Sequence, residues 1–268
     1  MKNFVEKYCE FPSTLRRPMW RIWHNLLIRF DKDISANFMN YGYAFLNEEQ
    51  SVALEQKDEV NRYCIQLYDH VVNRVNLENK KVLEVGSGRG GGADYIARYY
   101  KPLKYTAVDI SSSVINFCNK FYNVKGLSFV EGRAERLPVN GETFDAVVNV
   151  ESSRCYSNVE TFFNEVYRVL NDDGYFLFAD MIEKESINTI KTSLEKCGFS
   201  IKQETNITKN VAKGLSLDTA RREKLIKNKI PGFLQKSFGE FAGTEGTNRF
   251  NSFNNGKFEY WSFVLTKN

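Results

Sequence analysis

The segment from Val82 to Gly92 constrains the fold most, because it has the pattern of a buried strand, a glycine loop and the start of a helix. The apolar residues around Glu84 are typical of a central parallel strand that is covered on both faces. Glycines let the backbone turn tightly and approach a ligand closely. The spacing of the glycines fits two sequence patterns, and each pattern is typical of a different class of ligand. The dinucleotide fingerprint G-x-G-x-x-G is satisfied by Gly86, Gly88 and Gly91, and a shorter G-x-G-x-G pattern is satisfied by Gly86, Gly88 and Gly90.

The shorter pattern resembles the loop of class I S-adenosylmethionine methyltransferases. Glu84 stands two residues before the first glycine, at the carboxyl end of the predicted strand. In that family this position holds the ammonium and carboxylate end of the cofactor, whereas a pyrophosphate has no use for an anion there. The resemblance therefore implies S-adenosylmethionine as the cofactor.

A second predicted strand, 105–110, carries an acid near its end, Asp109, about 20 residues after the loop, where a carboxylate can bind ribose hydroxyls. The alternative role for Asp109 is to cap the helix that begins near Ser112. Ser111 and Ser112 can cap that helix equally well, so we expect Asp109 to bind the ribose.

A third strand, 127–131, leads into Gly132–Pro138, which is similar to the family motif G-D-A-E-x-L-P. The acid after the glycine binds the adenine amine in that family, but this chain has Arg133 there. Arginine only donates hydrogen bonds, so either Glu135 takes this role or the Arg133 guanidinium stacks on the adenine. The resemblance implies these cofactor-binding residues: Glu84, Gly86, Ser87, Gly88, Gly90, Asp109, Ile110, Ala134, Glu135 and Asn149.

Strands and helices continue to alternate along the chain, which is typical of a doubly wound α/β sheet. We expect seven mostly parallel strands in a Rossmann-like methyltransferase fold, with a helix over 159–170 stopped by a left-handed Gly174. The expected organisation is a helical N-terminal cover (1–75), an S-adenosylmethionine-binding core (76–208), a lid insert (209–250) and the final strand of the core sheet (251–268).

The two segments outside the core are expected to cover the acceptor. Trp20 and Trp23 fall on one face of a predicted helix, which would lie over the sheet or a partner subunit, or alternatively on a membrane surface. The predicted lid has a helical stretch over 215–228 and a break at Pro231. We expect residues 1–40 and 209–245 to border one apolar pocket that opens toward Gly86.

Composition excludes several function classes. The net charge of +4 is dispersed, and no dense Lys/Arg tract marks a nucleic-acid groove. Apolar stretches are too short for stable membrane insertion, although peripheral contact stays open. The five cysteines form no C-x-x-C pair, so we expect no metal and a reduced, cytoplasmic setting. Whether the chain is a monomer or a homodimer stays open.

Residues 150–156 point to one group within the methyltransferases. They read V-E-S-S-R-C-Y and are similar to the V-E-S-S-H-C-Y signature of bacterial lipid and polyketide O-methyltransferases. The type members act on phthiotriolone and phenolphthiotriolone dimycocerosates. Similar stretches extend over roughly 38–267. The resemblance implies an enzyme with a lipophilic small-molecule substrate, such as a hydroxylated polyketide, lipid or aromatic compound.

One departure concerns catalysis. Arg154 replaces the histidine of the signature, and arginine is a poor base near neutral pH. Arg154 could hold an oxyanion of the acceptor, form a structural ion pair, or contact the cofactor or lid. His24 in the predicted cover is a further candidate base.

Other chemistries stay open at this stage. An alkene acceptor, such as an isoprenoid or sterol-like compound, would be methylated on carbon through a carbocation, which aromatic faces and the nearby Glu151 would stabilise. The candidate aromatic residues are Tyr41, Tyr43, Trp20, Trp23 and Tyr156. An NAD-dependent oxidoreductase would need a lysine four residues after Tyr156, where the chain has Glu160. A non-catalytic cofactor-binding protein is the remaining alternative.

Overall fold

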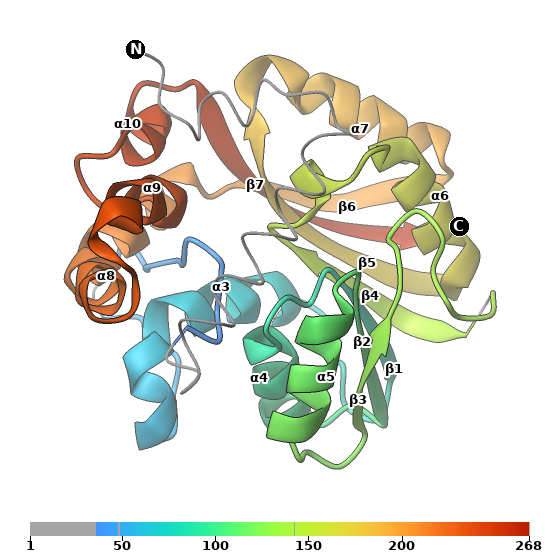
Figure 1. The fold of residues 1–268 in the computed structure, drawn as a ribbon. Helices are drawn as coiled ribbons and strands as arrows, with labels where there is room; N and C mark the ends of the chain where they lie inside the picture. Colours follow the sequence, from blue (N-terminus) through green and yellow to red (C-terminus); the bar gives the residue numbers. More distant parts are fainter. Residues whose placement is uncertain (1–35, 48, 142, 268) are drawn as a thin grey trace.

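The computed structural model describes residues 36–267 except Glu48 and Glu142. The described residues form one seven-stranded sheet with the order β3-β2-β1-β4-β5-β7-β6, in which β7 alone runs antiparallel to its neighbours (Figure 1). This confirms the predicted doubly wound, mostly parallel α/β fold. The strands are β1 (Lys81–Val85), β2 (Lys104–Asp109), β3 (Leu127–Glu131), β4 (Phe144–Val150), β5 (Leu170–Glu183), β6 (Phe199–Asn206) and β7 (Phe258–Lys267).

Helices cover both faces of the sheet because successive strand residues point to opposite sides. In β1, Val82 joins the core on one face and Leu83 the core on the other. The first face packs α3 (Arg62–Val72), α4 (Gly91–Tyr99) and α5 (Ser112–Phe121), and the second packs α6 (Val159–Val169) and α7 (Ile187–Lys196). Three short 3-10 turns are η1 (Gln56–Asn61), η2 (Ser153–Cys155) and η3 (Lys184–Ser186).

The order of strands reverses between β1 and β4, since the chain runs outward from β1 to β3 and then returns to the other side of β1. In doubly wound sheets, ligands bind outside the carboxyl ends of the strands at this switch point. The fold therefore directs the search for a site to the loops after β1, β2 and β4.

The end of α6 differs from the expectation. The helix stops at Val169, and buried Leu170 already pairs with Phe144 as the first residue of β5. The left-handed residue of the turn is Asp173, with φ 58°, and not Gly174. Aspartate tolerates this conformation. Gly174 is instead a close-packed position, because a Cβ there would lie 2.7 Å from the carbonyl of Asn171.

Three helices fill the predicted insert: α8 (Thr208–Lys229), α9 (Gly232–Ala242) and α10 (Asn248–Asn254). They lie together on one side of the sheet (Figure 1). The predicted helix over 215–228 is the inner part of α8, which begins seven residues earlier. The predicted break falls between α8 and α9, at Pro231.

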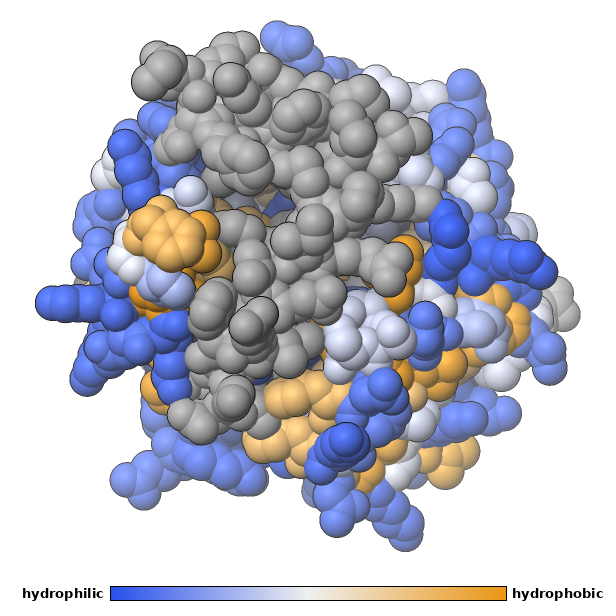
Figure 2. All heavy atoms as spheres, viewed as in Figure 1, coloured by the Kyte–Doolittle hydropathy of each residue, from blue (hydrophilic) through white to orange (hydrophobic). Residues whose placement is uncertain are grey.

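Residues 36–44, here called the entry segment, connect these helices to the glycine loop. The N–H of Gly91 donates to the carbonyl of Asn37, and the N–H of Ala44 donates to the carbonyl of Asn210 on α8. Figure 2 shows one face of the molecule, where hydrophilic groups predominate and hydrophobic groups gather in smaller areas. No helix among the described residues is both long enough and apolar enough to cross a membrane.

Candidate active site

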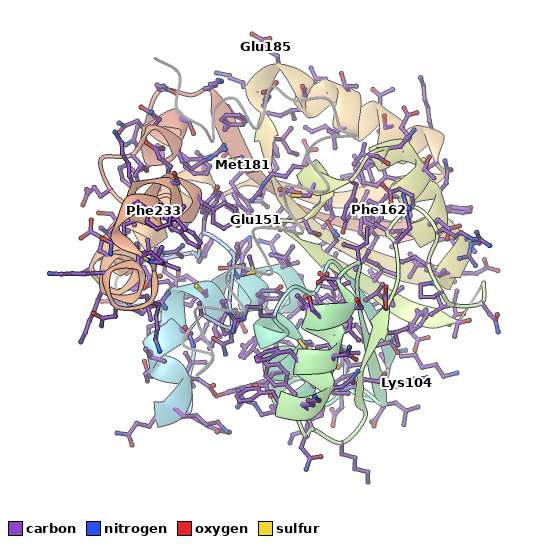
Figure 3. The ribbon with its side chains drawn as sticks, in the orientation of Figure 1. Lys104, Glu151, Phe162, Met181, Glu185 and Phe233 are labelled. Carbon is purple, nitrogen blue, oxygen red and sulfur yellow. The ribbon has the colours of Figure 1, made fainter. Side chains whose placement is uncertain are left out.

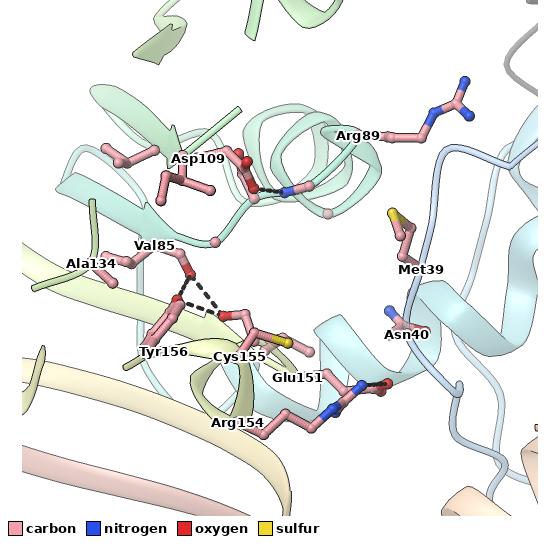
Figure 4. A pocket seen from close by; sticks show the side chains of 18 of the residues that line it. Met39, Asn40, Val85, Arg89, Asp109, Ala134, Glu151, Arg154, Cys155 and Tyr156 are labelled. Atoms are coloured by element: carbon pink, nitrogen blue, oxygen red, sulfur yellow. Dashed lines mark hydrogen bonds and ion pairs between the residues drawn. The ribbon is translucent and has the colours of Figure 1, made fainter. Parts of the chain in front are cut away.

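A cavity lies at the predicted switch point, between the carboxyl ends of β1, β2 and β4 and the entry segment (Figure 4). It contains about 1040 Å³ of empty space, including open solvent at its mouth. Its walls come from residues 37–40, 85–89, 108–110, 150–152 and 154–156, together with Tyr68, Gly92, Gly132, Ala134 and Glu135.

The glycine loop forms one wall of this cavity. Gly86 and Gly88 have φ values of 79° and 51°, a region that residues with a side chain rarely adopt. Ser87 between them has a buried hydroxyl without a hydrogen-bond partner among the described residues. Buried polar groups normally have partners, so this hydroxyl is available to a ligand. Gly90 lies outside the cavity, where it packs against Tyr122, so its predicted role as a cofactor contact is not supported.

Asp109 lines the cavity at the end of β2 and is almost completely buried. Its carboxylate accepts hydrogen bonds from the backbone N–H groups of Gly88 and Ser111, each at 3.0 Å. The N-cap residue of α5 is Ser111 itself. Asp109 therefore ties the glycine loop to β2 and presents its carboxylate at the cavity, at the place predicted for ribose binding.

The wall predicted for adenine is formed by Ile110, Ala134 and Glu135. The Glu135 carboxylate accepts from the backbone N–H and the hydroxyl of Ser157, both at 2.8 Å. Arg133 is exposed and does not line the cavity. Stacking of its guanidinium on an adenine is therefore not supported, whereas Glu135 is at the expected place.

Glu84 differs from its prediction. It is fully buried and absent from the cavity wall. Its carboxylate accepts from the hydroxyls of Tyr68, at 2.9 Å, and Tyr105, at 3.1 Å. Burial raises the pKa of Glu84 to about 7, against the lowering effect of the two tyrosine hydrogen bonds. Tyr68 itself lines the cavity, so Glu84 is linked to the cavity wall through the Tyr68 hydroxyl.

Asn149 is also buried away from the cavity and holds the end of β1. Its amide nitrogen donates to the carbonyl of Val85 at 2.8 Å and lies 2.8 Å from the Ser152 hydroxyl and 2.9 Å from the Tyr156 hydroxyl. The hydroxyls of Ser152 and Tyr156 lie 2.7 Å apart. This group lies under Gly86, where a Cβ would overlap the Ser152 hydroxyl. Asn149 and Tyr156 therefore support the glycine loop, and Tyr156 shows no free hydroxyl for catalysis.

Arg154 lies on the cavity wall between two buried carboxylates. Its guanidinium is 3.1 Å from Glu151 and 3.1 Å from Asp180 at the end of β5. The guanidinium also lies 5.5 Å from the centre of the Tyr41 ring. The single positive charge of Arg154 is therefore already shared between two carboxylates. This count does not support the expectation that Arg154 binds an oxyanion, because a third anion there would be repelled by both carboxylates.

Glu151 is the carboxylate of this group that lines the cavity. It follows β4 directly and has a φ of 54°, which is unfavourable for a residue with a side chain and is typical of functional sites. Its second oxygen accepts from the backbone N–H of Tyr41 at 2.8 Å and from the Tyr260 hydroxyl at 3.1 Å. Burial raises its pKa, while the charge of Arg154 opposes that rise. Figure 3 shows Glu151 in the middle of the molecule.

Among the described residues, the other aromatic candidates do not line the cavity. Tyr41 and Tyr43 are buried outside its wall, and His70 stacks on Tyr43 with ring centres 4.6 Å apart. Burial lowers the pKa of His70 to about 4. His24, Trp20 and Trp23 lie outside the described residues. Of the aromatic residues named for the carbocation hypothesis that the structure describes, Tyr156 alone lines the cavity.

Sequence reasoning missed several wall and supporting residues. Met39 and Tyr68 line the cavity, and Asp180 supports Arg154 from behind. A signal for Asp180 existed, because it is an acid near the carboxyl end of a predicted strand and such ends meet at one edge of a parallel sheet. No local pattern marks Met39 or Tyr68. Among the described residues, no group of His, Cys, Asp or Glu is arranged to hold a metal ion.

The predicted common pocket is divided. The entry segment contributes residues 37–40 to the cavity, but residues 209–245 contribute none. They line a second cavity between α8 and α9 instead. The reason is that the entry segment lies between α8 and the glycine loop, so Phe38 and Met39 line both cavities.

Comparison with known proteins identifies the family. Residues 83–178 match the methyltransferase domain family. The chain is 35% identical over 255 residues to a phthiotriol/phenolphthiotriol dimycocerosates methyltransferase of Mycobacterium tuberculosis, covering 95% of this chain and 94% of the relative. The chain belongs to this methyltransferase family.

Two further likenesses agree with the methyltransferase assignment. A fatty-acid O-methyltransferase of Mycolicibacterium smegmatis is 39% identical over 204 residues, which cover 76% of this chain and 74% of that protein. A cyclopropane synthase of Mycobacterium tuberculosis has the same fold, with a TM-score of 0.66 at 13% identity, over 88% of this chain and 95% of that one. The chain is therefore an enzyme that transfers a methyl group, and the oxidoreductase and the non-catalytic alternatives are set aside.

Proposed function

We propose that this methyltransferase transfers the methyl group of S-adenosylmethionine to an oxygen atom of a lipid. The observation that carries the proposal is the presence, on one cavity wall, of the glycine loop and of Glu151 held by Arg154. Two relatives support the substrate class, since their names specify phthiotriol dimycocerosates and fatty acids.

The cavity wall fits the cofactor. Gly88 leaves space beside the loop, since the nearest atom to a Cβ there is the Met39 sulfur at 3.8 Å. The Ser87 hydroxyl, which has no partner among the described residues, offers a hydrogen bond. Asp109, Ala134 and Glu135 line the cavity, and we assign the Asp109 carboxylate to the ribose hydroxyls and the other two residues to the adenine. When bound, the cofactor supplies a methyl group that its sulfonium already activates.

Glu151 is the residue that we assign to the acceptor's proton. A hydroxyl becomes a better nucleophile as it loses its proton to a positioned base. Glu151 is a carboxylate on the wall whose pKa is raised by burial, toward the range in which a base works near neutral pH. Arg154 and the N–H of Tyr41 fix its two oxygens, so one orientation faces the cavity. Arg154 is a positioning residue in this scheme.

A methyl-transfer assay tests the proposal. The full chain is incubated with S-adenosylmethionine labelled in the methyl group and with hydroxylated lipids, free fatty acids, phenols and prenyl alkenes. We expect label in a base-stable methyl ether or a base-labile methyl ester of a lipid. Label on carbon of an alkene, or in none of the compounds, contradicts the proposal.

The cofactor assignment has a test of its own. Asp109→Asn should weaken binding of S-adenosylhomocysteine about 10- to 100-fold in calorimetry, because it removes a charged partner of the ribose. Asp172→Asn is the matched control, since Asp172 is exposed and far from the cavity. Equal affinities of the two variants would show that Asp109 only stabilises the loop.

A further inference from the structure

The second cavity has the character of a binding site for hydrocarbon. It lies between α8 and α9, contains about 710 Å³ of empty space with open solvent included, and is lined mainly by apolar side chains. Among them are Leu225 and Ile226 on α8 and Phe238 and Phe241 on α9. We refer to it as the α8–α9 chamber.

Two of the three charged residues on its wall, Arg221 and Arg222, are paired with protein groups, and the third is Lys229. Arg222 donates to Asp218 at 2.9 Å and to the carbonyls of Tyr41 and Ala242, both at 3.1 Å. Arg221 donates to Asp218 at 2.6 Å. Some buried polar side-chain atoms lack a hydrogen-bond partner among the described residues, but none of them belongs to a residue on the chamber wall. The wall therefore offers a ligand mainly apolar contacts, and few of its polar groups need a hydrogen bond from the ligand.

The chamber is next to the site of methyl transfer. Phe38 and Met39 line both cavities, and the Met39 sulfur would lie 3.8 Å from a Cβ built on Gly88 in the glycine loop. Figure 4 shows Met39 at the edge of the first cavity, opposite Asp109. The two side chains thus form the partition between the cavity at the glycine loop and the α8–α9 chamber.

The backbone of the partition is fixed on both sides. Glu151 holds the N–H of Tyr41 from the first cavity, and Arg222 holds the carbonyls of Asn40 and Tyr41 from the chamber side. The side chains of Phe38 and Met39 have no such polar anchor. Methionine adapts its shape readily, so its rotamer can open a passage while the backbone stays in place.

We propose that the α8–α9 chamber binds the alkyl chain of the acceptor lipid, while the acceptor's oxygen lies in the first cavity beside Glu151. The inference rests on the proposed function and names its substrate more closely: a lipid with a single long chain that extends past Met39. Chain length is then selected by the chamber between α8 and α9, and the chemistry is decided by the other cavity.

The test compares two Leu→Trp variants on one helix. Leu225→Trp places a bulky ring in the chamber, whereas Leu217→Trp changes a residue that is 52% exposed and lines neither cavity. The kcat/KM of each is measured on fatty acids and hydroxylated acids of about six to about sixteen carbons. For the unmodified chain we expect a gain of up to about fourfold per added methylene, equivalent to about 0.8 kcal/mol, until the chamber is filled.

The kcat/KM of Leu225→Trp should fall at least about tenfold more on the longest acids than on the shortest ones. The kcat/KM of Leu217→Trp should equal that of the unmodified protein at every length. Equal losses at all lengths, or no loss, would overturn the inference. Ala242→Phe fills the chamber from α9 and replaces Leu225→Trp if that variant does not fold.

A binding measurement separates the inference from the proposed function. The fluorescence of dansyl-aminoundecanoic acid is titrated with the full chain, and hexadecanoic acid is used to displace it. Binding that weakens at least about tenfold in Leu225→Trp, but not in Leu217→Trp, supports the chamber even if no lipid is methylated, in which case only the proposed function fails. Absence of binding, or equal binding by all variants, rejects the chamber.

Discussion

The backbone N–H of Tyr41 donates a hydrogen bond of 2.8 Å to the side chain of Glu151, although 110 residues separate them in the chain. This bond joins the entry segment to the end of β4 at the floor of the candidate active site. The same carboxylate accepts from Arg154. Glu151 therefore fixes the backbone beside the partition between the two cavities, and under the proposed function it also takes the acceptor's proton.

Replacement of Glu151 by glutamine tests its role as a base. Glutamine preserves the size of the side chain and one of its two acceptor oxygens, but it cannot take a proton. We therefore expect Glu151→Gln to lower kcat about 10²- to 10⁴-fold. The dissociation constant of S-adenosylhomocysteine should stay within about twofold. Glu245→Gln, at an exposed position on the surface, is the control. A variant with nearly full kcat would remove Glu151 from the chemistry.

Removal of the Arg154 charge should move the pH profile. Arg154 opposes the rise that burial causes in the pKa of Glu151, so Arg154→Ala raises that pKa further. Because the base works when ionised, the acid limb of the kcat profile should shift toward higher pH. Arg154→Lys retains the charge and should return the acid limb at least part of the way to its original pH.

The same Arg154→Ala change should lower the free energy of unfolding by about 3 kcal/mol, since two buried carboxylates lose their cation. Urea unfolding measures this loss. A drop in kcat with no movement of the acid limb would mean that Arg154 has only a structural role.

Gly92 tests the contact between α4 and Tyr68. A Cβ on Gly92 would overlap the Tyr68 ring, which is itself hydrogen-bonded to Glu84. We expect Gly92→Ala to lower the free energy of unfolding by about 1–3 kcal/mol. Gly232→Ala is the matched control, because nothing lies within 4 Å of a Cβ there, and it should change stability by less than about 0.5 kcal/mol. Equal effects of the two changes would show that Tyr68 moves aside at no cost.

Glu84 makes stability depend on pH. Burial raises its pKa from 4.5 to about 7 in the folded state. The folded chain thus holds this proton more tightly than the unfolded chain, so the stability that Glu84 contributes is complete below about pH 4.5 and is lost as the pH rises to about 7. Between about pH 5 and about pH 8, the unmodified chain should lose about 2–3 kcal/mol relative to Glu84→Gln in urea unfolding. A constant difference between the two chains over this range would show that Glu84 stays ionised when buried.

The order of elements and the place of the cofactor loop could be predicted from the sequence. Glycine spacing, strand-length apolar runs and helical periodicity are local properties, and in a doubly wound sheet they lead to the switch point between β1 and β4. Asp109, Ala134 and Glu135 were expected at this edge because Asp109 ends β2, Ala134 and Glu135 lie in the loop after β3, and the carboxyl ends of parallel strands meet at one edge.

The exact partners of the charged groups could not be predicted in this way. Glu84 has the sequence position of a cofactor contact, but two tyrosines from α3 and β2 enclose it. Arg154 reads as a lone cation after β4, and only the fold brings Asp180 to it from β5. Partners that are 16 to 26 residues apart in the chain are chosen by packing.

The sequence by itself determined the fold class, the glycine loop and the carboxylate at the end of β2, because these depend on backbone conformation and short-range periodicity. Only the tertiary structure decided which carboxylate reaches the cavity and where the insert packs. Glu151 reaches the cavity because its backbone adopts a φ of 54° at the end of β4. The insert forms a separate apolar chamber because residues 36–44 pass between α8 and the glycine loop, held by hydrogen bonds from both sides.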